Sequence, residues 1–140
     1  MYGPGQIPQK GSGMVADTVY AARNNQPIKI IGDGKRKRSY IFSDDVVDIS
    51  ILSSIEKSSE NKLFNAGTSE ILTTNEIIDF VSNLTGKKTI VEHLQESLNQ
   101  AVSIYPDITK MKNLLDYECK TKFSDGLKKT IEWQTQKTIL

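Results

Sequence analysis

The sequence predicts a single α/β domain, residues 1–140, in which a small mixed sheet packs against helices. Its length of 140 residues is that of one ordinary domain. Hydrophobic residues make up 37% of the chain and charged residues 25%, which is typical of a folded globular protein. Short β-branched runs alternate with helical patterns, and no linker or internal repeat divides the chain.

The first elements follow from glycine, proline and hydrophobic spacing. Residues 1–13 contain four glycines and two prolines, which indicates a loop. Apolar residues recur at helical spacing over 15–22, and a β-branched run over 27–31 predicts a strand. The Gly32-Asp33-Gly34 turn ends this strand, and a second strand is expected over 39–42.

A helix is expected to begin at Asp44 and to bury one apolar face. Val47, Ile51 and Ile55 recur at steps of four along it. Asp44 and Asp45 look like a catalytic carboxylate pair. However, adjacent acids before an apolar-faced helix are more typical of a cap and a partner for the helix dipole. No chemistry is therefore assigned to them.

The second half is expected to supply two strands, over 62–66 and 89–94, and three helices. Thr73 and Glu76 have the spacing of a capping box, and Gly86 ends the helix that they open. The expected apolar face of this helix is formed by Ile77, Val81 and Leu84. A fourth helix is expected to be capped by Asp107 and to carry Ile108, Met111, Leu114 and Leu115. The last helix is expected from Ser124 and carries Leu127, Ile131 and Trp133.

Charge and residue counts argue against several classes of function. Eighteen basic and 17 acidic side chains leave a net charge of +1, which does not favour nucleic acid or a membrane surface as partner. No apolar run approaches the roughly 20 residues that cross a bilayer. One cysteine, Cys119, and one histidine, His93, cannot form an internal disulfide or a multi-histidine metal site. A cytoplasmic location is the expectation.

Arg38 is the leading candidate for a binding residue. It follows the glycine turn at the start of a predicted strand, so its guanidinium could reach a ligand across that turn. A guanidinium pairs bidentately with phosphate oxygens. Arg38 also belongs to the basic run 35–38, whose charges alone would more often be solvated. A run of four is too short to indicate a nucleic-acid patch by itself.

A loose dinucleotide fingerprint is present at Gly11, Gly13 and Ala16, with Asp33 further on. That fingerprint requires a buried strand before the turn, so that a helix N-terminus receives the pyrophosphate. The residues ahead of Gly11 include Pro8 and do not have a strand pattern. No cofactor-binding, metal-binding or catalytic residue is assigned in this chain.

Several segments, in their order and spacing, resemble one known family. They are YGPGQ at 2–6, the turn Gly32-Asp33-Gly34 with Arg38, KRSYIFSDDVVD, KLFNAG, NEIIDFVSNLTGKK, DITKMKNLL followed by Tyr117, and DGLKKTIEW. Together they are similar to the C-terminal, substrate-binding half of an NAD-dependent nucleotide-sugar epimerase/dehydratase of the extended short-chain dehydrogenase/reductase family. The resemblance implies a portion of that fold without the N-terminal Rossmann half.

The resemblance also implies roles for particular residues. Arg38 would bind the diphosphate of a nucleotide-sugar, and Pro27, Ile28 and Ile30 would line its base. Gln6, in the opening motif, is a further candidate for substrate binding. NAD would serve the complete family enzyme and is not assigned to this chain.

Two departures from the family pattern weaken the expected activity. No tyrosine here has a lysine four residues later, so the family's Tyr-x-x-x-Lys acid/base pair is absent. No arginine lies between His93 and Asp107, where the family usually has a basic substrate contact. We therefore expect a truncated protein that binds a nucleotide-sugar weakly and is not catalytic alone. The alternatives are a non-enzymatic partner module, which self-associates or pairs with a Rossmann-half chain, and a non-functional remnant.

Overall fold

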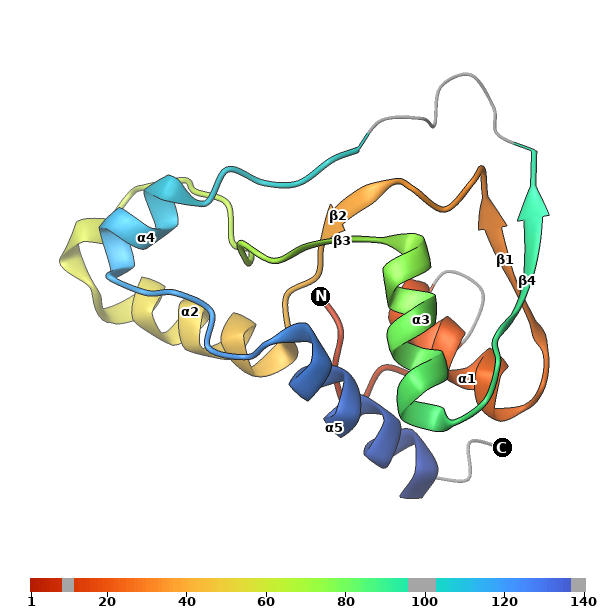
Figure 1. Ribbon diagram of the computed structural model, residues 1–140. Helices are drawn as coiled ribbons and strands as arrows, with labels where there is room; N and C mark the ends of the chain where they lie inside the picture. The colour runs from red at the N-terminus through yellow and green to blue at the C-terminus, as the bar shows by residue number, and fades with distance from the viewer. Residues whose placement is uncertain (9–11, 96–102, 137–140) are drawn as a thin grey trace.

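The computed structural model describes residues 1–8, 12–95 and 103–136, which form helices around two small sheets (Figure 1). In chain order the elements are α1 (Met14–Arg23), β1 (Pro27–Ile31), β2 (Lys37–Ser39), α2 (Ser43–Ile55), the 3-10 helix η1 (Lys57–Ser59), β3 (Ile71–Thr73), α3 (Thr74–Thr85), β4 (Ile90–Leu94), α4 (Thr109–Leu115) and α5 (Phe123–Gln136). The mixed α/β class and the small sheets agree with the prediction.

Each described sheet has two strands. β1 and β4 pair in parallel, with Ile30 opposite His93. β2 and β3 pair antiparallel, with Arg38 opposite Leu72. A two-stranded sheet is marginal without a packed face, so both sheets depend on the helices beside them.

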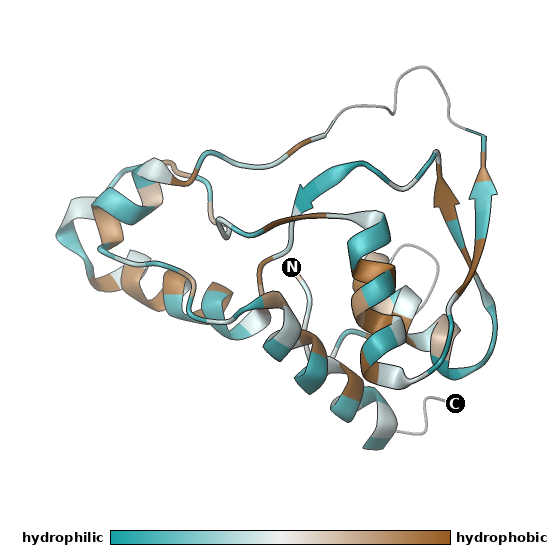
Figure 2. Cartoon of the chain, viewed as in Figure 1, coloured by the Kyte–Doolittle hydropathy of each residue, from teal (hydrophilic) through white to brown (hydrophobic). Residues whose placement is uncertain are grey.

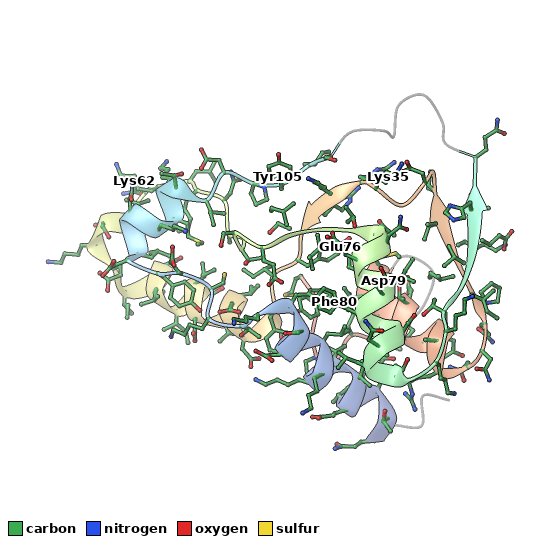
Figure 3. The ribbon with its side chains drawn as sticks, in the orientation of Figure 1. Lys35, Lys62, Glu76, Asp79, Phe80 and Tyr105 are labelled. Atoms are coloured by element: carbon green, nitrogen blue, oxygen red, sulfur yellow. The ribbon has the colours of Figure 1, made fainter. Side chains whose placement is uncertain are left out.

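The central body, as we term α1, α3 and α5 with the two sheets, contains the larger apolar core. The three helices contact one another, and Phe123 at the start of α5 lies at the centre of an aromatic group. Its ring centroid is 5.0 Å from that of Tyr2 and 5.4 Å from that of Phe80, which points from α3 toward α5 (Figure 3). The buried members of this core are Tyr2, Val15, Val19, Ala22, Phe42, Leu72, Ile77, Val81, Phe123 and Leu127.

Tyr2 fixes the N-terminal segment in this core, although the sequence predicts only a loop there. Its side chain is buried, and its hydroxyl donates a hydrogen bond to the Phe123 carbonyl at 3.1 Å. The absence of a side chain at Gly126 permits this approach, because a Cβ there would overlap the rings of Tyr2 and Phe42. A glycine inside a helix costs about 1 kcal/mol relative to alanine. At Gly126 the same lack of a side chain allows the rings of Tyr2 and Phe42 to pack closely against the helix.

The second region, the α2–α4 arm (residues 43–67 and 108–121), extends away from α3 in Figure 1. It has a smaller core in which α2 and α4 pack together. The buried members of that core are Ile41, Ile49, Met111, Leu115 and Tyr117. Figure 2 shows hydrophobic positions along α2.

A buried carboxylate joins the two sides of the arm. Asp45, in the first turn of α2, accepts hydrogen bonds from the Tyr117 hydroxyl at 2.8 Å and from the Lys120 N–H at 2.7 Å. The Thr121 N–H donates to its other oxygen at 3.3 Å. Burial would raise the pKa of Asp45, but these donors hold the pKa below its usual range. The interpretation of this carboxylate as architectural fits its contacts.

Three predictions about the arm and the residues that lead into it need correction. The strand expected over 39–42 is β2 at Lys37–Ser39, and Phe42 instead forms an isolated bridge with Tyr2. The strand expected over 62–66 pairs with no strand among the described residues, although the backbone there is not helical. The N-cap of α2 is Phe42, without a side-chain cap bond, rather than Asp44.

The apolar face predicted for α2 is also wrong. Val47, Ile51 and Ile55 are 55%, 54% and 66% exposed. Ile49 is the apolar residue of α2 that is buried, with Val46 partly buried against the same core. Apolar residues lie on both sides of this helix, so spacing alone selected the wrong side.

The capping box of α3 is confirmed in detail. The Glu76 N–H donates to the Thr73 hydroxyl at 3.2 Å, and the Thr73 N–H donates to the Glu76 carboxylate at 2.7 Å. Gly86 ends α3 in the left-handed conformation, as predicted. On the predicted apolar face, Ile77 and Val81 are fully buried, whereas Leu84 is 44% exposed.

The remaining predicted elements lie close to their expected positions. α1 and β1 match the helix and strand expected in the first half, and β4 matches the strand expected over 89–94. The N-cap of α4 is Ile108 rather than the predicted Asp107, although the Asp107 carboxylate accepts a hydrogen bond from the Thr109 N–H at 2.9 Å. Within the described ranges, none of the helices combines the length and apolar character required to span a bilayer.

Candidate functional site

An open pocket of about 440 Å³ lies where the N-terminal loop, α1, β1 and β2 meet. Its lining residues are Met1, Gln6, Gly13, Met14, Val15, Lys29, Ile30, Ile31, Arg36, Arg38, Ser39, Tyr40 and Thr74. Among the described residues, the lining includes three cationic side chains and no carboxylate side chain. Such a pocket favours an anionic ligand with an apolar part.

The turn between β1 and β2 is held from two sides. From α3, the Asn75 amide donates to the Asp33 carbonyl at 3.0 Å, and the Asn75 N–H donates to the Gly34 carbonyl at 3.1 Å. Gly34 has φ +76°, and a Cβ there would overlap the Asn75 side chain. Only glycine therefore fits this position without strain.

The same turn is held from β4 by His93. Its Nδ1 lies 2.8 Å from the Gly32 carbonyl, and because a carbonyl can only accept, Nδ1 carries the proton. The Gly32 N–H in turn donates to the Leu94 carbonyl at 3.0 Å. His93 thus has a structural contact, and the turn that leads into the basic run is fixed.

Arg38 lies in the middle of β2 and lines the pocket. Backbone pairing with Leu72 on β3 and an isolated bridge to Ile104 fix its main chain, while its side chain is exposed. Tyr40, two residues on, lines the pocket as well. Burial raises the pKa of the Tyr40 phenol, and the nearby positive charge of Arg38 opposes that rise.

Gln6, from the N-terminal loop, also lines this pocket. Its amide NH₂ donates to the Ser12 carbonyl, which fixes the orientation of the side chain. Its carbonyl Oε1 is buried and accepts no hydrogen bond from any described residue. A buried acceptor without a donor is costly, and a ligand hydroxyl or N–H at this position would satisfy it.

The first turn of α1 adds positive potential. Gly13, the N-cap of α1, provides no side-chain cap, and Gly13, Met14 and Val15 line the pocket. The free N–H groups of a helix N-terminus and the helix dipole attract anions. Asp17 in the same turn offsets part of this potential.

The structure brings three of the five predicted binding residues together. Gln6, Ile30 and Arg38 line the pocket. Pro27 and Ile28 lie at the start of β1 and are not among the lining residues. A strand advances about 3.3 Å per residue, so Pro27 is about 10 Å along β1 from Ile30. The binding roles of all five residues stay predictions.

Sequence reasoning missed several lining side chains. Lys29 and Arg36 contribute positive charge, and Tyr40 and Thr74 contribute hydroxyls. Lys29 forms an ion pair with Glu92 of β4 at 3.6 Å. Strand alternation places Lys29 on the face of β1 opposite Ile30, so it gave no signal for Lys29. Thr74, at the start of α3, comes to the pocket through the antiparallel pairing of β2 with β3.

Other potentially reactive groups lie outside this pocket. The Cys119 thiol donates to the Gly67 carbonyl at 3.2 Å, and burial raises the pKa of this thiol to about 11. Among the described residues, no group of three histidine, cysteine or carboxylate side chains is arranged to hold a metal ion. The stretch in which the family's arginine was sought falls largely at 96–102, outside the described residues.

NAD, which the family resemblance implies, does not fit the described part of the fingerprint around Gly13. Residues 6–8 form no strand in the structure, and Gly11 lies outside the described residues. The strand–turn–helix unit that cradles a pyrophosphate is therefore not built by the described residues ahead of α1. We derive no chemical step through NAD in this chain.

Comparison with known proteins identifies relatives of the chain. Residues 1–67 match the NAD dependent epimerase/dehydratase family. The chain is 29% identical, over 97% of its length, to a UDP-glucuronate 4-epimerase of Thermodesulfobacterium geofontis, of which it covers 41%. It is 28% identical to a UDP-glucose 4-epimerase of Mycolicibacterium smegmatis, of which it covers 44%.

Solved structures of epimerases also match this chain over part of their own length. An epimerase of Methanothermobacter thermautotrophicus superposes with a TM-score of 0.89 at 28% identity, over 96% of this chain and 40% of that one. The UDP-glucose 4-epimerase of Thermotoga maritima, solved with UDP-glucose, gives a TM-score of 0.85 at 29% identity, over 96% of this chain and 43% of that one. The chain thus spans about two fifths of the length of these relatives.

Proposed function

We propose that this chain, a relative of the NAD-dependent epimerases/dehydratases that corresponds to about two fifths of their length, binds a nucleotide-sugar in the pocket beside β1 and β2. The observation that carries the proposal is the meeting of Arg38, Gln6 and Ile30 in one pocket. These residues come from three separate segments, and each suits a different part of such a ligand.

The chemistry of the lining supports this ligand class. A nucleotide-sugar carries two phosphates, and Arg38 can pair with their oxygens through two N–H groups. The first turn of α1 adds N–H donors for an anion. Ile30 and Ile31 offer apolar contact to a base, and the buried Gln6 Oε1 offers an acceptor to a hydroxyl or N–H. The solved relative from Thermotoga maritima holds UDP-glucose.

We further propose that the chain does not turn over this ligand by itself. Epimerisation and dehydration require proton transfer by a positioned acid/base group. The family's Tyr-x-x-x-Lys pair is absent from the sequence. Tyr40, which lines the pocket, is followed four residues later by Asp44 and not by a lysine. Turnover of UDP-glucose by the purified chain with added NAD would contradict this part of the proposal.

Pairing with a polypeptide that supplies the coenzyme-binding part of the fold is the second candidate function. The observation that favours it is the exposed apolar face of α2, where Val47, Ile51 and Ile55 are each more than half exposed. Apolar side chains on one face of a helix are normally buried against another element. This chain would then bind the substrate, and its partner would bind the coenzyme of the complete enzyme.

The test of ligand binding compares Arg38→Ala with the unaltered chain. Titration calorimetry with UDP-glucose and dTDP-glucose should show that Arg38→Ala weakens binding about ten- to hundredfold, because a charge-assisted contact is worth about 1.5–3 kcal/mol. Lys35→Ala is the matched control, since Lys35 is on the same turn, pairs with Asp33 and does not line the pocket. Equal dissociation constants for Arg38→Ala and the unaltered chain would contradict the proposed role of Arg38.

A further inference from the structure

Two of the cationic side chains of the pocket come from one short stretch of the chain. Arg36 and Arg38 both line the pocket, whereas Lys37 between them is not among the described lining residues. Side chains alternate along an extended chain, so residues two apart project on the same side. Because a strand advances about 3.3 Å per residue, the Cα atoms of the two arginines are about 7 Å apart. At this spacing, two long arginine side chains can reach one ligand that carries more than one anionic group.

The turn ahead of these arginines is held through three successive carbonyl groups. The Gly32 carbonyl lies 2.8 Å from the donor Nδ1 of His93 on β4. The next two carbonyls both accept from Asn75 on α3: that of Asp33 from the side-chain amide at 3.0 Å, and that of Gly34 from the main-chain N–H at 3.1 Å. Figure 1 shows the start of α3 beside the turn between β1 and β2. Donors from two other elements therefore fix the turn.

The main chain is fixed again beyond Arg36. The Lys37 N–H donates to the Ser103 hydroxyl at 3.1 Å. Arg38 pairs with Leu72 of β3 and forms an isolated bridge with Ile104. Ordering flexible groups when a ligand binds costs free energy, and a main chain that is already fixed reduces this cost. The two arginines thus project from a preorganised part of the chain.

We propose that Arg36 and Arg38 together form a clamp for a diphosphate group, and that Asn75 is a positioning residue that holds the turn from which this clamp projects. A guanidinium can pair with two oxygens of one phosphate, so two guanidinium groups suit two linked phosphates better than a single one. The site therefore selects a nucleoside diphosphate over a monophosphate. This inference rests on the proposed function, because it gives the diphosphate of the proposed ligand a second contact.

Titration calorimetry with UDP, UMP, inorganic pyrophosphate and UDP-glucose tests the clamp. Arg36→Ala should weaken binding of UDP at least about tenfold and binding of UMP less than about threefold, because UMP lacks the second phosphate. Arg36→Lys keeps the charge but not the planar fork, so it should restore only part of the affinity for UDP. Lys37→Ala is the matched control: it removes the same charge from the neighbouring position, whose side chain is not part of the described lining.

The positioning role of Asn75 is tested by a double-mutant cycle. Asn75→Ala removes the donor to the Asp33 carbonyl. It should weaken binding of UDP about fivefold in the unaltered chain, but less than about twofold in a chain that also carries Arg36→Ala. Thr73→Ala is the control, because it weakens the start of the same helix and leaves both bonds of Asn75 in place. Equal losses of affinity in Asn75→Ala and Thr73→Ala, or the same loss in both backgrounds, would contradict the positioning role.

The outcomes separate this inference from the proposed function. If UDP-glucose binds and Arg36→Ala binds it equally well, or if the unaltered chain binds UDP and UMP equally, the clamp is overturned and the proposed function stands. If pyrophosphate binds in a manner that depends on Arg36 but UDP-glucose does not bind, the nucleotide-sugar function is refuted and the clamp stands. Binding of none of the four probes would overturn both. Circular dichroism checks that each variant is folded, and Arg36→Lys replaces Arg36→Ala in the comparison if the latter is not.

Discussion

The central body and the α2–α4 arm are stabilised in different ways, although they belong to one short chain. In the central body, three helices enclose a core of ten buried residues from widely separated parts of the sequence. In the arm, a small core of four buried arm residues and Ile41, just ahead of α2, is supplemented by the Asp45 hydrogen-bond network. Both regions expose apolar residues, but those of the body are distributed over β1, α3 and β4, whereas those of the arm include three that share one face of α2.

The two regions also differ in what they contribute to the proposed ligand pocket. The proposed ligand pocket is built on the central body, from β1, β2 and the first turn of α1. The arm contributes none of the residues that line this pocket. A unit can therefore keep a formed pocket even when its arm is loosely held, and the following changes test whether the two regions can be weakened separately.

The largest effect is expected from Phe123→Ala in the central body. Phe123 contacts Tyr2, Tyr40 and Phe80, so its truncation leaves a cavity that few neighbours can fill. We expect the free energy of unfolding to fall by about 3–5 kcal/mol, measured by denaturant titration. Phe64→Ala in the arm is the comparison, because Phe64 is only partly buried. A loss at Phe64 as large as that at Phe123 would contradict the distinction between the two regions.

A smaller effect, confined to the arm, is expected from Asp45→Asn. The substitution removes a charged acceptor from the N–H groups of Lys120 and Thr121 and from the Tyr117 hydroxyl. Loss of such charge-assisted bonds costs about 1.5–3 kcal/mol. Amide hydrogen exchange should accelerate in α2 and α4 before it does in α3. Uniform acceleration over all three helices would show that the arm and the body open together.

The same carboxylate predicts how acid acts on the arm. The pKa of Asp45 is lower in the folded chain than the value of about 3.9 expected when unfolded. Its contribution is therefore complete above that unfolded value and is lost as pH falls through the folded pKa. As pH falls below about 5 and then through the folded pKa, the arm of the unaltered chain should lose protection, while Asp45→Asn should show a flatter pH dependence. Matching pH profiles would contradict this assignment.

The smallest effect is expected from Thr73→Ala at the start of α3. It removes the side-chain acceptor for the Glu76 N–H and half of the capping box. Loss of such a cap costs about 1 kcal/mol. Denaturant titration measures the loss, and Thr85→Ala, at the other end of α3, is the control. Equal stability of the two variants would indicate that the packing of Ile77 and Val81, not the cap, fixes this end of the helix.

The sequence was sufficient where a local signal decided the structure. The capping box at Thr73 and Glu76, the left-handed Gly86 and the β-branched run of β1 each depend on neighbouring residues. Such signals act within a few residues and do not require knowledge of the rest of the fold. The order of the helices could be predicted for the same reason, whereas between α2 and α3 the sequence predicted a strand over 62–66 and the structure has η1 and the short β3.

Features that depend on contacts between distant parts of the chain could not be predicted from the sequence. Val47, Ile51 and Ile55 have ideal helical spacing, but so do the residues of α2 that face the small core, and only the fold selects between the two sides. The residues 62–66 have a strand pattern without a described partner. In the pocket, Arg38 followed from its motif, whereas Thr74 could not be placed before the pairing of β2 with β3 was known.

The contact between Tyr2 and Phe123 also bears on how this molecule is made. The hydroxyl of Tyr2 reaches a carbonyl 121 positions later, and its ring lies against Gly126 of α5. During synthesis the N-terminal segment therefore leaves the ribosome long before its partner exists. The N-terminal segment, whose Met1 and Gln6 help to line the pocket, can therefore make its contacts with α5 only after α5 has emerged.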